Sequence, residues 1–431
     1  MVSDCLNVNE KGNLTIGGAD TVQTAKEFGT PLYVFDEATI RESCRSFKKS
    51  IDQYYDGNGL VLYASKAFAC KEIYRIVGSE GLGTDVVSGG ELYTALSVGF
   101  PAEKIFFHGN NKTLDEIQYA VKNDVGHIVV DNITELNTLN SVSAKNGKNV
   151  NVMLRIKPGI DAHTHNFIKT GQIDSKFGFA LETGEALAGA KAAINLSNIN
   201  LTGMHCHIGS QIFETEPFCL AAKTMIEFLK DIKTQTDVTL TELNLGGGFG
   251  IKYVESDTPR KYDEFMCEVS KSLKAKCKEI EFPVPKMFIE PGRSIIAPAG
   301  ITLYTVGAIK NIPNVRTYVS IDGGMGDNPR YALYQAPYDV LIANKASQPK
   351  DFVATVAGKC CESGDLIQEN APIQTPEVGD TLAVLATGAY NYSMASNYNR
   401  IPRPAAVMIK DGIARMIIQR ESYEDLVRND I

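Results

Sequence analysis

The chain has 431 residues, of which 44% are apolar and 22% charged, and its formal net charge is −8 with a pI near 5.4. These values are ordinary for a globular protein, and the negative balance excludes a general attraction to nucleic acid or to an anionic membrane. A chain of this length exceeds what one small core needs, so two domains are expected.

The sequence also bears on where the protein works. The N-terminus lacks a basic region followed by an apolar core, so no signal peptide is predicted. No apolar run approaches the roughly 18 residues that cross a bilayer, so no membrane association is predicted. The nine cysteines are scattered without a CxxC spacing, and Cys360 and Cys361 are adjacent. This pattern predicts free thiols in a reducing cytoplasm.

Residues 1–30 are polar with short alternating pieces, which do not indicate a barrel or a sheet of their own. From residue 31 onward, short apolar runs alternate with helical patterns. Eight runs are predicted as strands: Leu60–Tyr63, Gly83–Val87, Ile105–His108, His127–Val130, Asn151–Ile156, Leu201–His207, Glu242–Leu245 and Met287–Ile289. The predicted helices include Lys71–Gly78, Glu91–Val98, Leu114–Lys122, Thr134–Ala144, Leu220–Lys233 and Tyr262–Glu279. Thr113 and Glu116 match a capping box at one helix start.

Eight repeats of strand and helix predict the α/β class, with a parallel (β/α)8 barrel over residues 31–294. A doubly wound sheet is the alternative. The barrel is favoured because nearly every run is followed by a polar or glycine-rich cluster, and the ends of parallel barrel strands converge on one face.

After Arg293 the helices become rare and turns rich in Gly, Asp, Asn and Pro separate short apolar runs. A second, mostly β domain is therefore predicted over residues 295–431, with residues 1–30 joining it. Its predicted strands are Ile301–Ala308, Tyr318–Ile321, Val340–Ala343, Phe352–Val356, Leu382–Leu385 and Ala406–Ile409. Lys410-Asp-Gly-Ile413 is typical of a hairpin turn.

Lys66 ends the first barrel run, in Tyr63-Ala-Ser-Lys-Ala67. One interpretation is a solvated strand end, the commonest place for a lysine. The other is an amine in a desolvated pocket that forms a Schiff base. The rest of the chain has to decide between them.

Two further strand ends could bind a ligand. Gly246-Gly-Gly-Phe-Gly250 could present backbone N–H groups to a phosphate, although a tight turn explains it equally well. His205 and His207 alternate on one face of a strand. A metal pair would need further ligands, so packing on a flat ligand or a core position is favoured. A metal role is equally disfavoured for His163 and His165, which lie in a predicted loop. No metal site is predicted.

Glu290-Pro-Gly-Arg293 places an acid and a guanidinium at the last barrel strand. They could simply pair with each other, or Glu290 could hold a proton on a ring nitrogen while Arg293 meets a carboxylate. In the second domain Cys361 stands beside Glu362 and Asp365 in sequence, where it is a proton donor, a nucleophile or a buried structural residue.

Taken together these segments resemble the diaminopimelate decarboxylases, in the alanine-racemase-like group of pyridoxal-phosphate decarboxylases that also contains ornithine and arginine decarboxylases. The matching motifs are Tyr63-Ala-Ser-Lys-Ala67, Phe107-His-Gly-Asn-Asn-Lys112, His207-Ile-Gly-Ser-Gln211, Gly246-Gly-Gly-Phe-Gly250, Glu290-Pro-Gly-Arg-Ser294, Cys361-Glu-Ser-Gly-Asp365, Gly388-Ala-Tyr390 and Tyr398-Asn-Arg400. They follow the family's order over nearly the whole chain. The resemblance implies a barrel plus a β domain, in a head-to-tail homodimer with shared active sites.

The resemblance also implies a cofactor site for pyridoxal 5′-phosphate. Lys66 would hold the cofactor as a Schiff base, Glu290 would keep its ring nitrogen protonated, and His207 would stack on the ring. Asp85 would support the lysine side of the pocket. The remaining implied cofactor-binding residues are Ser210, the Gly246–Gly248 amides (chiefly Gly247 and Gly248), Gly292, Arg293 and Tyr390.

The implied reaction is decarboxylation of meso-2,6-diaminopimelate to L-lysine and CO2, the last step of lysine biosynthesis. Cys361 of the partner chain would donate the proton. Residues implied for substrate binding are Arg293, Arg330 and Tyr334 at the distal carboxylate, Glu362 at the distal ammonium, and Tyr390. The segment from Asp161 through Gly178 resembles the family's mobile loop over the site.

Two departures from the family pattern concern Ala357-Gly-Lys-Cys-Cys361, where Gly-Pro-x-Cys is usual, and Asn328-Pro-Arg330, a variant of an Arg-Pro pattern. The alternatives are the same chemistry on ornithine, arginine or carboxynorspermidine, a catalytically silent relative that binds the cofactor, or a metal-dependent hydrolase. A substrate with a lone distal cation would be expected to need an acid there and no pair of arginines.

Overall fold

The computed structural model describes residues 1–160 and 174–431, and it divides the chain into two compact units. The barrel unit consists of residues 43–250 and 259–292. The β unit consists of residues 1–42, 251–258 and 293–431. No described helix is both long enough and apolar enough to span a membrane.

The barrel unit contains a closed parallel barrel of eight strands. Its strands are β5 (Gly59–Ala64), β6 (Gly83–Val86), β7 (Ile105–Phe107), β8 (His127–Val130), β9 (Val150–Lys157), β11 (Ile199–Cys206), β12 (Glu242–Asn244) and β13 (Lys286–Ile289). Each pairs in parallel with the next, and β13 pairs with β5 to close the ring. The predicted barrel, with its eight strands, is therefore confirmed. The short strand β10 (Phe179–Ala180) adds one further parallel pairing to β9.

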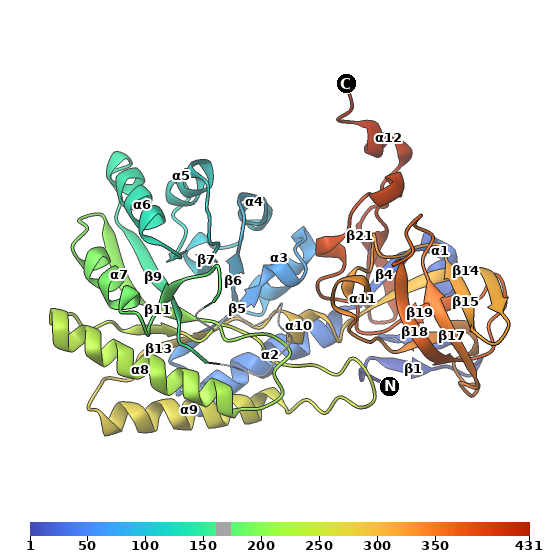
Figure 1. The fold of residues 1–431 in the computed structure, drawn as a ribbon, viewed down its shortest axis with the longest axis horizontal. Coiled ribbons are helices and arrows are strands. Elements are labelled where there is room, and N and C mark those ends of the chain that lie inside the picture. Colours follow the sequence, from blue (N-terminus) through green and yellow to red (C-terminus); the bar gives the residue numbers. More distant parts are fainter. Residues whose placement is uncertain (161–173) are drawn as a thin grey trace. The chain divides into compact units, whose positions relative to one another are not determined.

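Helices cover the outside of the barrel, as Figure 1 shows. They are α3 (Lys71–Ser79), α4 (Gly89–Leu96), α5 (Leu114–Lys122), α6 (Ile133–Lys145), α7 (Glu185–Ile194), α8 (Glu216–Thr236) and α9 (Tyr262–Glu279). The capping box of Thr113 and Glu116 is formed at α5, so the N-terminal N–H groups of that helix are satisfied as predicted. Helix α7 was not predicted, because its many Ala and Gly residues give no clear apolar stripe.

A compact apolar cluster fills the barrel interior. Its members come from five different strands and are at most 1% exposed: Leu62, Phe106, Val129, Met153 and Phe288. Side chains alternate along a strand, so these residues point into the barrel and fill its interior. The polar residues lie beyond this cluster, at the carboxyl ends of the strands. The barrel is thus a packed core, with its chemistry confined to one end.

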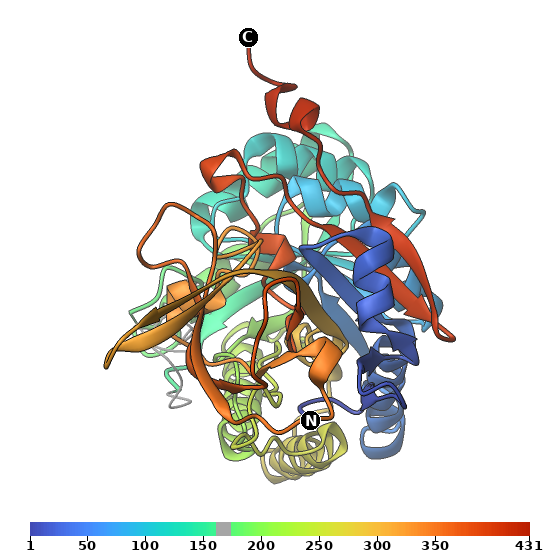
Figure 2. The ribbon, with the colours of Figure 1, turned by 90° about the vertical axis from the view of Figure 1, so that its right-hand side faces the viewer.

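The β unit is built on a mixed sheet with the order β18-β17-β15-β14-β4-β20-β21. Its strands are β4 (Leu32–Asp36), β14 (Gly300–Ile312), β15 (Arg316–Ile321), β17 (Phe352–Ala357), β18 (Leu366–Ile373), β20 (Ala405–Lys410) and β21 (Ile413–Ile418), with β16 (Val340–Ile342) and β19 (Thr381–Val384) attached through β14. In Figure 2 the blue strand β4 lies beside the red β20, to which it is paired in parallel. Asp411 and Gly412, both with positive φ, form the predicted hairpin turn between β20 and β21.

The N-terminal segment differs in two ways from the expectation. Residues 6–20 form a small sheet of their own, β1 (Leu6–Val8), β2 (Leu14–Ile16) and β3 (Ala19–Asp20), followed by α1 (Thr21–Phe28). Strands of two or three residues are too short to show a period in the sequence. In addition, β4 pairs with β14 and β20 and not with barrel strands. The β unit thus includes residues up to 42, beyond the predicted boundary at 31. Helix α2 (Glu37–Tyr54) runs from this unit into the barrel unit.

Asp327 is a buried acid in the core of the β unit, and it makes the stability of this unit depend on pH. Its Oδ2 accepts a hydrogen bond from Tyr304 Oη at 2.6 Å and its Oδ1 accepts one from the N–H of Gly324 at 2.8 Å. Burial nevertheless raises the pKa of Asp327 to about 7. The folded protein therefore binds a proton that the unfolded chain releases from about pH 4.

The stabilisation from this proton is complete below pH 4 and is lost as the pH rises through 7. We expect the unfolding free energy of the wild-type protein to fall by about 3–4 kcal/mol more than that of Asp327→Asn between pH 4 and pH 8. The asparagine cannot ionise, so it lacks this pH dependence. Denaturant unfolding followed by circular dichroism at pH 4 and pH 8 measures the difference. Asp351→Asn, at an exposed position of the same unit, is the control. Parallel pH dependence of the wild-type protein and Asp327→Asn would contradict this assignment.

Candidate active site

Polar side chains gather at the carboxyl ends of the barrel strands. Because the strands are parallel, these ends meet at one end of the barrel, where active sites of this architecture lie. The groups placed there, or on the loops that follow, are Lys66, Asp85, His108, Arg155, His205, His207, Ser210, Asn244, Gly246–Gly248 and Glu290.

Lys66 lies in a single helical turn, Ser65–Ala67, directly after β5. The backbone of this turn is fixed by its neighbours: the Ser65 N–H donates to Asp85 Oδ1 at 3.2 Å, and the Ser65 hydroxyl donates to Glu91 Oε2 at 2.8 Å. Gly292 packs against the same turn so closely that a Cβ there would stand 2.8 Å from the Cβ of Ala64. The side chain of Lys66 itself is exposed. The barrel therefore presents an accessible amine on a rigid support.

Glu290 follows β13 and is buried, with only 7% of its surface exposed. Its carboxylate has three side-chain nitrogen atoms close to it. Asn244 Nδ2 donates to its Oε1 at 2.7 Å, and His205 Nε2 lies 3.2 Å from its Oε2 in hydrogen-bond geometry. His108 Nε2 approaches Oε1 at 2.8 Å without the alignment of a hydrogen bond. Oε1 thus has two nitrogen neighbours and Oε2 one, so Oε2 can accept a further N–H.

These contacts determine the charges of the site. Burial opposes ionisation of Glu290, but its interactions with His108 and His205 outweigh this and hold its pKa well below the ordinary value. Burial lowers the pKa of His205 to about 4 and also lowers that of His108, which favours the neutral form of both imidazoles. Burial, with the charge of Glu290, raises the pKa of Asp85 well above its usual range. The two shifts run in opposite directions, so the site favours the charged form of Glu290 and disfavours that of Asp85.

The glycine turn after β12 is packed too tightly for any side chain. A Cβ on Gly247 would lie 2.1 Å from the carbonyl oxygen of Glu290, and one on Gly248 would lie 2.4 Å from that of Gly209. Gly246 and Gly248 also have φ values of +68° and +114°, which favour glycine. The N–H of Gly247 is already used, since it donates to His207 Nδ1 at 3.2 Å.

Other backbone N–H groups of the glycine turn are not used in this way. Among the described residues, the N–H groups of Gly248 and Phe249 have no hydrogen-bond partner. These two amides, and not that of Gly247, are open to an anion. His207 accepts through Nδ1, and burial lowers its pKa well below the ordinary value, so its ring is neutral and flat.

The β unit holds the second group of predicted residues. Arg293 Nη1 donates to Tyr253 Oη at 2.5 Å, and its guanidinium carbon lies 4.6 Å from the ring centre of Tyr390. Tyr390 has φ +61°, a left-handed conformation that costs an aromatic residue on the order of 1–3 kcal/mol. Arg330 and Tyr334 lie in the short helix α11 (Arg330–Tyr334). Arg330 also packs on Tyr253.

Cys361 is exposed on a loop of the β unit, as is Glu362. The N–H of Cys361 donates to Asn399 Oδ1 at 2.7 Å, and that of Cys360 donates to Asp365 Oδ2 at 2.7 Å. Asp365 is 3% exposed and its Oδ1 accepts the N–H of Met325 at 2.5 Å. An acid and an amide thus fix the backbone of the loop while the Cys361 thiol stays accessible.

Among the described residues one group has metal-ligand spacing: His108, His205 and Glu290, whose candidate ligand atoms lie within 4.8 Å of one another. His205 and His207, the pair considered from the sequence, are separated here, because His207 faces Gly247 while His205 faces Glu290. The two histidines of this group are the same ones that contact the Glu290 carboxylate.

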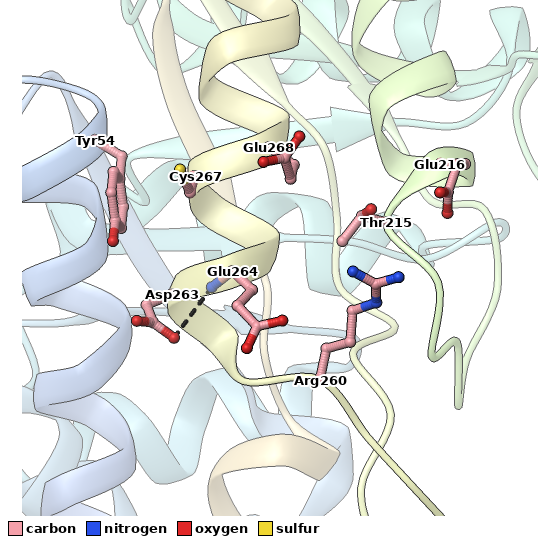
Figure 3. A pocket seen from close by; sticks show the side chains of 8 residues that line it. All are labelled: Tyr54, Thr215, Glu216, Arg260, Asp263, Glu264, Cys267 and Glu268. Carbon is pink, nitrogen blue, oxygen red and sulfur yellow. Dashed lines mark hydrogen bonds between the residues drawn. The ribbon is translucent and has the colours of Figure 1, made fainter.

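A surface pocket of about 330 Å³ elsewhere in the barrel unit does not contain the predicted residues. Figure 3 shows its lining, with one guanidinium among four carboxylates: Tyr54, Thr215, Glu216, Arg260, Asp263, Glu264, Cys267 and Glu268. Its wall is formed by α9 and the start of α8, on the helical outside of the barrel.

Three residues of the site were not assigned from the sequence: His108, Arg155 and Asn244. Arg155 stacks on Phe177 at 4.2 Å, and burial lowers its pKa although Asp131 and Glu290 oppose the shift. A polar residue within or directly after an apolar strand run is the signal that could have pointed to each of them. Of the predicted mobile loop, residues 161–173 lie outside the described residues.

Comparison with known proteins identifies the family of this chain. Residues 37–297 match the family described as "Pyridoxal-dependent decarboxylase, pyridoxal binding domain". The barrel is thus that of a pyridoxal-dependent decarboxylase, and the cofactor is pyridoxal phosphate. The diaminopimelate decarboxylases of Halalkalibacterium halodurans and Bacillus subtilis are 50% and 48% identical to this chain, each alignment covering 98% of this chain and 96% of the relative. The chain belongs to the diaminopimelate decarboxylase family.

Solved structures support the same assignment. The crystal structure of diaminopimelate decarboxylase from M. jannaschii in co-complex with L-lysine has a TM-score of 0.92 and 34% identity, covering 100% of this chain and 98% of that chain. The Helicobacter pylori enzyme complexed with L-lysine has a TM-score of 0.86 at 29% identity, covering 95% of this chain and 98% of that chain. The resemblance drawn from the sequence motifs is therefore confirmed.

The residues of the barrel unit fit this cofactor. Pyridoxal phosphate carries an aldehyde, a ring nitrogen and a phosphate, which need an amine, an acid and N–H donors. Lys66 is an accessible amine, Glu290 has an acceptor position open on Oε2, and the amides of Gly248 and Phe249 are unpaired among the described residues. The close packing of the glycine turn shows why a backbone cradle, and not side chains, would hold the phosphate.

Proposed function

We propose that this protein decarboxylates meso-2,6-diaminopimelate to L-lysine and CO2, the last step of lysine biosynthesis. The observation that carries the choice of substrate is the pair of guanidinium groups, Arg293 and Arg330, that contact one tyrosine of the β unit. Two guanidinium groups suit a substrate with a second carboxylate, whereas ornithine, arginine and carboxynorspermidine end in a cation.

When bound, pyridoxal phosphate supplies an aldehyde that joins to amines and a ring that accepts the electron pair left by the departing CO2. The Lys66 amine would hold it, and Glu290 would keep the ring nitrogen protonated through its open Oε2 position. The neutral His207 ring would face the cofactor ring. Ser210, Gly248 and Phe249 would donate hydrogen bonds to the phosphate, with Tyr390 as a further cofactor ligand.

The remaining roles concern the substrate. Arg293, Arg330 and Tyr334 would bind the distal carboxylate, and Glu362 would bind the distal ammonium. The Cys361 thiol would deliver a proton to the carbon from which CO2 departs. We propose that Cys361 of one chain serves the active site of the other chain in a head-to-tail homodimer. An exposed thiol on a fixed loop suits this role.

We also propose that the protein works in the cytoplasm. All nine cysteines are free in the structure, including the buried Cys44, Cys206 and Cys277. Free thiols in this number are typical of a reducing compartment.

The test of the proposed function is CO2 release from meso-diaminopimelate with and without added pyridoxal phosphate, with ornithine and arginine as comparison substrates. We expect cofactor-dependent turnover of diaminopimelate alone. Turnover of ornithine or arginine instead would keep the chemistry and overturn the substrate. Binding of the cofactor without turnover of any substrate would identify a silent relative.

Glu290→Gln tests the acid at the ring nitrogen. A glutamine cannot carry the negative charge that favours a protonated ring, so we expect kcat to fall about 10²- to 10³-fold. Steady-state CO2 release measures this. Glu242→Gln is a matched control, because Glu242 also contacts a barrel histidine, His127, at 2.8 Å. It should leave kcat within about twofold, on the basis that its pair lies outside the site. Equal kcat values for Glu290→Gln and the wild-type enzyme would remove Glu290 from this role.

A further inference from the structure

One tyrosine of the β unit contacts both arginines of the proposed carboxylate site. Tyr253 lies in the short segment Ile251–Thr258 and is 2% exposed. Its hydroxyl accepts a hydrogen bond from Arg293 Nη1 at 2.5 Å. Its ring supports Arg330, whose guanidinium carbon lies 3.6 Å from the ring centre. The hydroxyl and the ring face of a single side chain thus position two different cations.

The orientation of Arg330 is fixed on one side only. Its Nη1 donates to the carbonyl oxygens of Ala336 and Pro337 at 3.2 and 2.8 Å. Within residues 1–160 and 174–431, its other N–H groups have no hydrogen-bond partner, and no carboxylate lies within ion-pair distance of it. Nε and Nη2 therefore remain available, and this edge of a guanidinium can bind a carboxylate in bidentate geometry.

Tyr253 is itself held firmly in place. The N–H groups of Tyr253 and Val254 both donate to Asp257 Oδ2, at 2.9 and 3.2 Å, which fixes the turn. The ring packs edge-on against Tyr338 with ring centres 5.9 Å apart. The Tyr338 hydroxyl in turn accepts a hydrogen bond from Asn391 Nδ2 at 2.9 Å. A rigid ring gives the two guanidinium groups a defined separation.

Two guanidinium groups that share one neutral side chain repel each other, and the aromatic face offsets only part of this repulsion. An oxyanion between them would turn the repulsion into attraction. We propose that Tyr253 is a positioning residue that arranges Arg293 and Arg330 as a single carboxylate clamp and so selects a substrate with a second carboxylate. This inference rests on the proposed function and identifies a specificity residue within it.

Ligands that differ by one carboxylate isolate this role. Decarboxylation removes one carboxylate of the substrate, so L-lysine retains the other, while 1,5-diaminopentane has neither. We expect Tyr253→Phe, which keeps the ring and removes the acceptor, to weaken L-lysine binding about tenfold. Tyr253→Leu, which removes both contacts, should weaken it about a hundredfold. Binding of 1,5-diaminopentane should stay within about twofold in both variants, because it has no carboxylate for the clamp.

The measurements are calorimetric titration of each ligand into the holoenzyme, KM and kcat for meso-diaminopimelate, and the Kd of pyridoxal phosphate by absorbance. KM should rise with L-lysine Kd while kcat changes less than threefold, on the reasoning that the clamp binds ground and transition states alike. Tyr331→Phe is the control, because it removes another tyrosine hydroxyl of the β unit, bonded to Glu369 at 2.7 Å.

Three outcomes would overturn the inference. Equal weakening of L-lysine and 1,5-diaminopentane would show a general packing effect. Weaker binding of pyridoxal phosphate with unchanged L-lysine binding would show that the clamp holds the cofactor phosphate and not a substrate carboxylate. Unchanged L-lysine binding in both variants would remove Tyr253 from the site. If the wild-type enzyme failed to turn over diaminopimelate, the proposed function would fail, yet the comparison of the two ligands would still test Tyr253.

Discussion

Lys66→Ala is expected to abolish decarboxylation, with kcat reduced at least about a thousandfold. The proposed role of Lys66 is to hold pyridoxal phosphate through its amine and to take part in exchanging substrate and product on it. Lys66 stands directly after β5 on a turn whose backbone and serine are held by Asp85 and Glu91. The variant should also lose the visible absorbance that the cofactor acquires when covalently attached to an amine.

Lys66→Arg separates the charge of this residue from its reactivity. Arginine keeps a cation beside His207 and Asp85 but is protonated at all accessible pH values, so it cannot act as a nucleophile. We therefore expect Lys66→Arg to be as inactive as Lys66→Ala. Lys71→Ala, at an exposed lysine in the first turn of α3, is the control and should retain full activity. Activity of Lys66→Arg within tenfold of wild type would contradict the proposed nucleophile.

Arg330→Ala is expected to reduce kcat/KM for meso-diaminopimelate about a hundredfold or more. Loss of a bidentate, charge-assisted contact to a carboxylate costs about 2–5 kcal/mol. The loss should appear mainly in KM, since the distal carboxylate is remote from the bond that breaks. Steady-state kinetics with diaminopimelate and with ornithine compare a substrate that has this carboxylate with one that lacks it.

Arg316→Ala supplies the comparison for charge. Arg316 is another arginine of the β unit, paired with Glu369 at 2.7 Å and not in contact with Tyr253 in the described contacts. Its loss changes the net charge equally and should leave kcat/KM nearly unchanged. If Arg330→Ala retained wild-type activity on diaminopimelate, Arg330 would be removed from the proposed carboxylate site, and the pair of guanidinium groups would no longer support the proposed substrate.

Much of the barrel could be predicted from the sequence because its information is local. A strand buried on both faces is a short apolar run, and a surface helix has an apolar stripe, so the runs at β5 to β13 and the capping box at α5 were identifiable. The Asp411–Gly412 turn was identifiable because a two-residue hairpin needs positive φ at both positions. Elements without such a signal were missed. Examples are the two- and three-residue strands β1 to β3, and the alanine-rich helix α7.

In the candidate site, too, only the information held in contiguous segments could be predicted. Motif order sufficed to identify the family and to nominate Lys66 and Glu290, which stand in contiguous segments. Which side chains contact them was not encoded in any segment. Glu290 receives Asn244 from β12 and His205 from β11, and Arg293 and Arg330 share Tyr253. Such partners are brought together by strand order and loop path. The tertiary structure decided that the pKa of Glu290 is lowered while that of Asp85 is raised, because burial and nearby charges and hydrogen-bond donors, not residue type, determine the free energy of a charge.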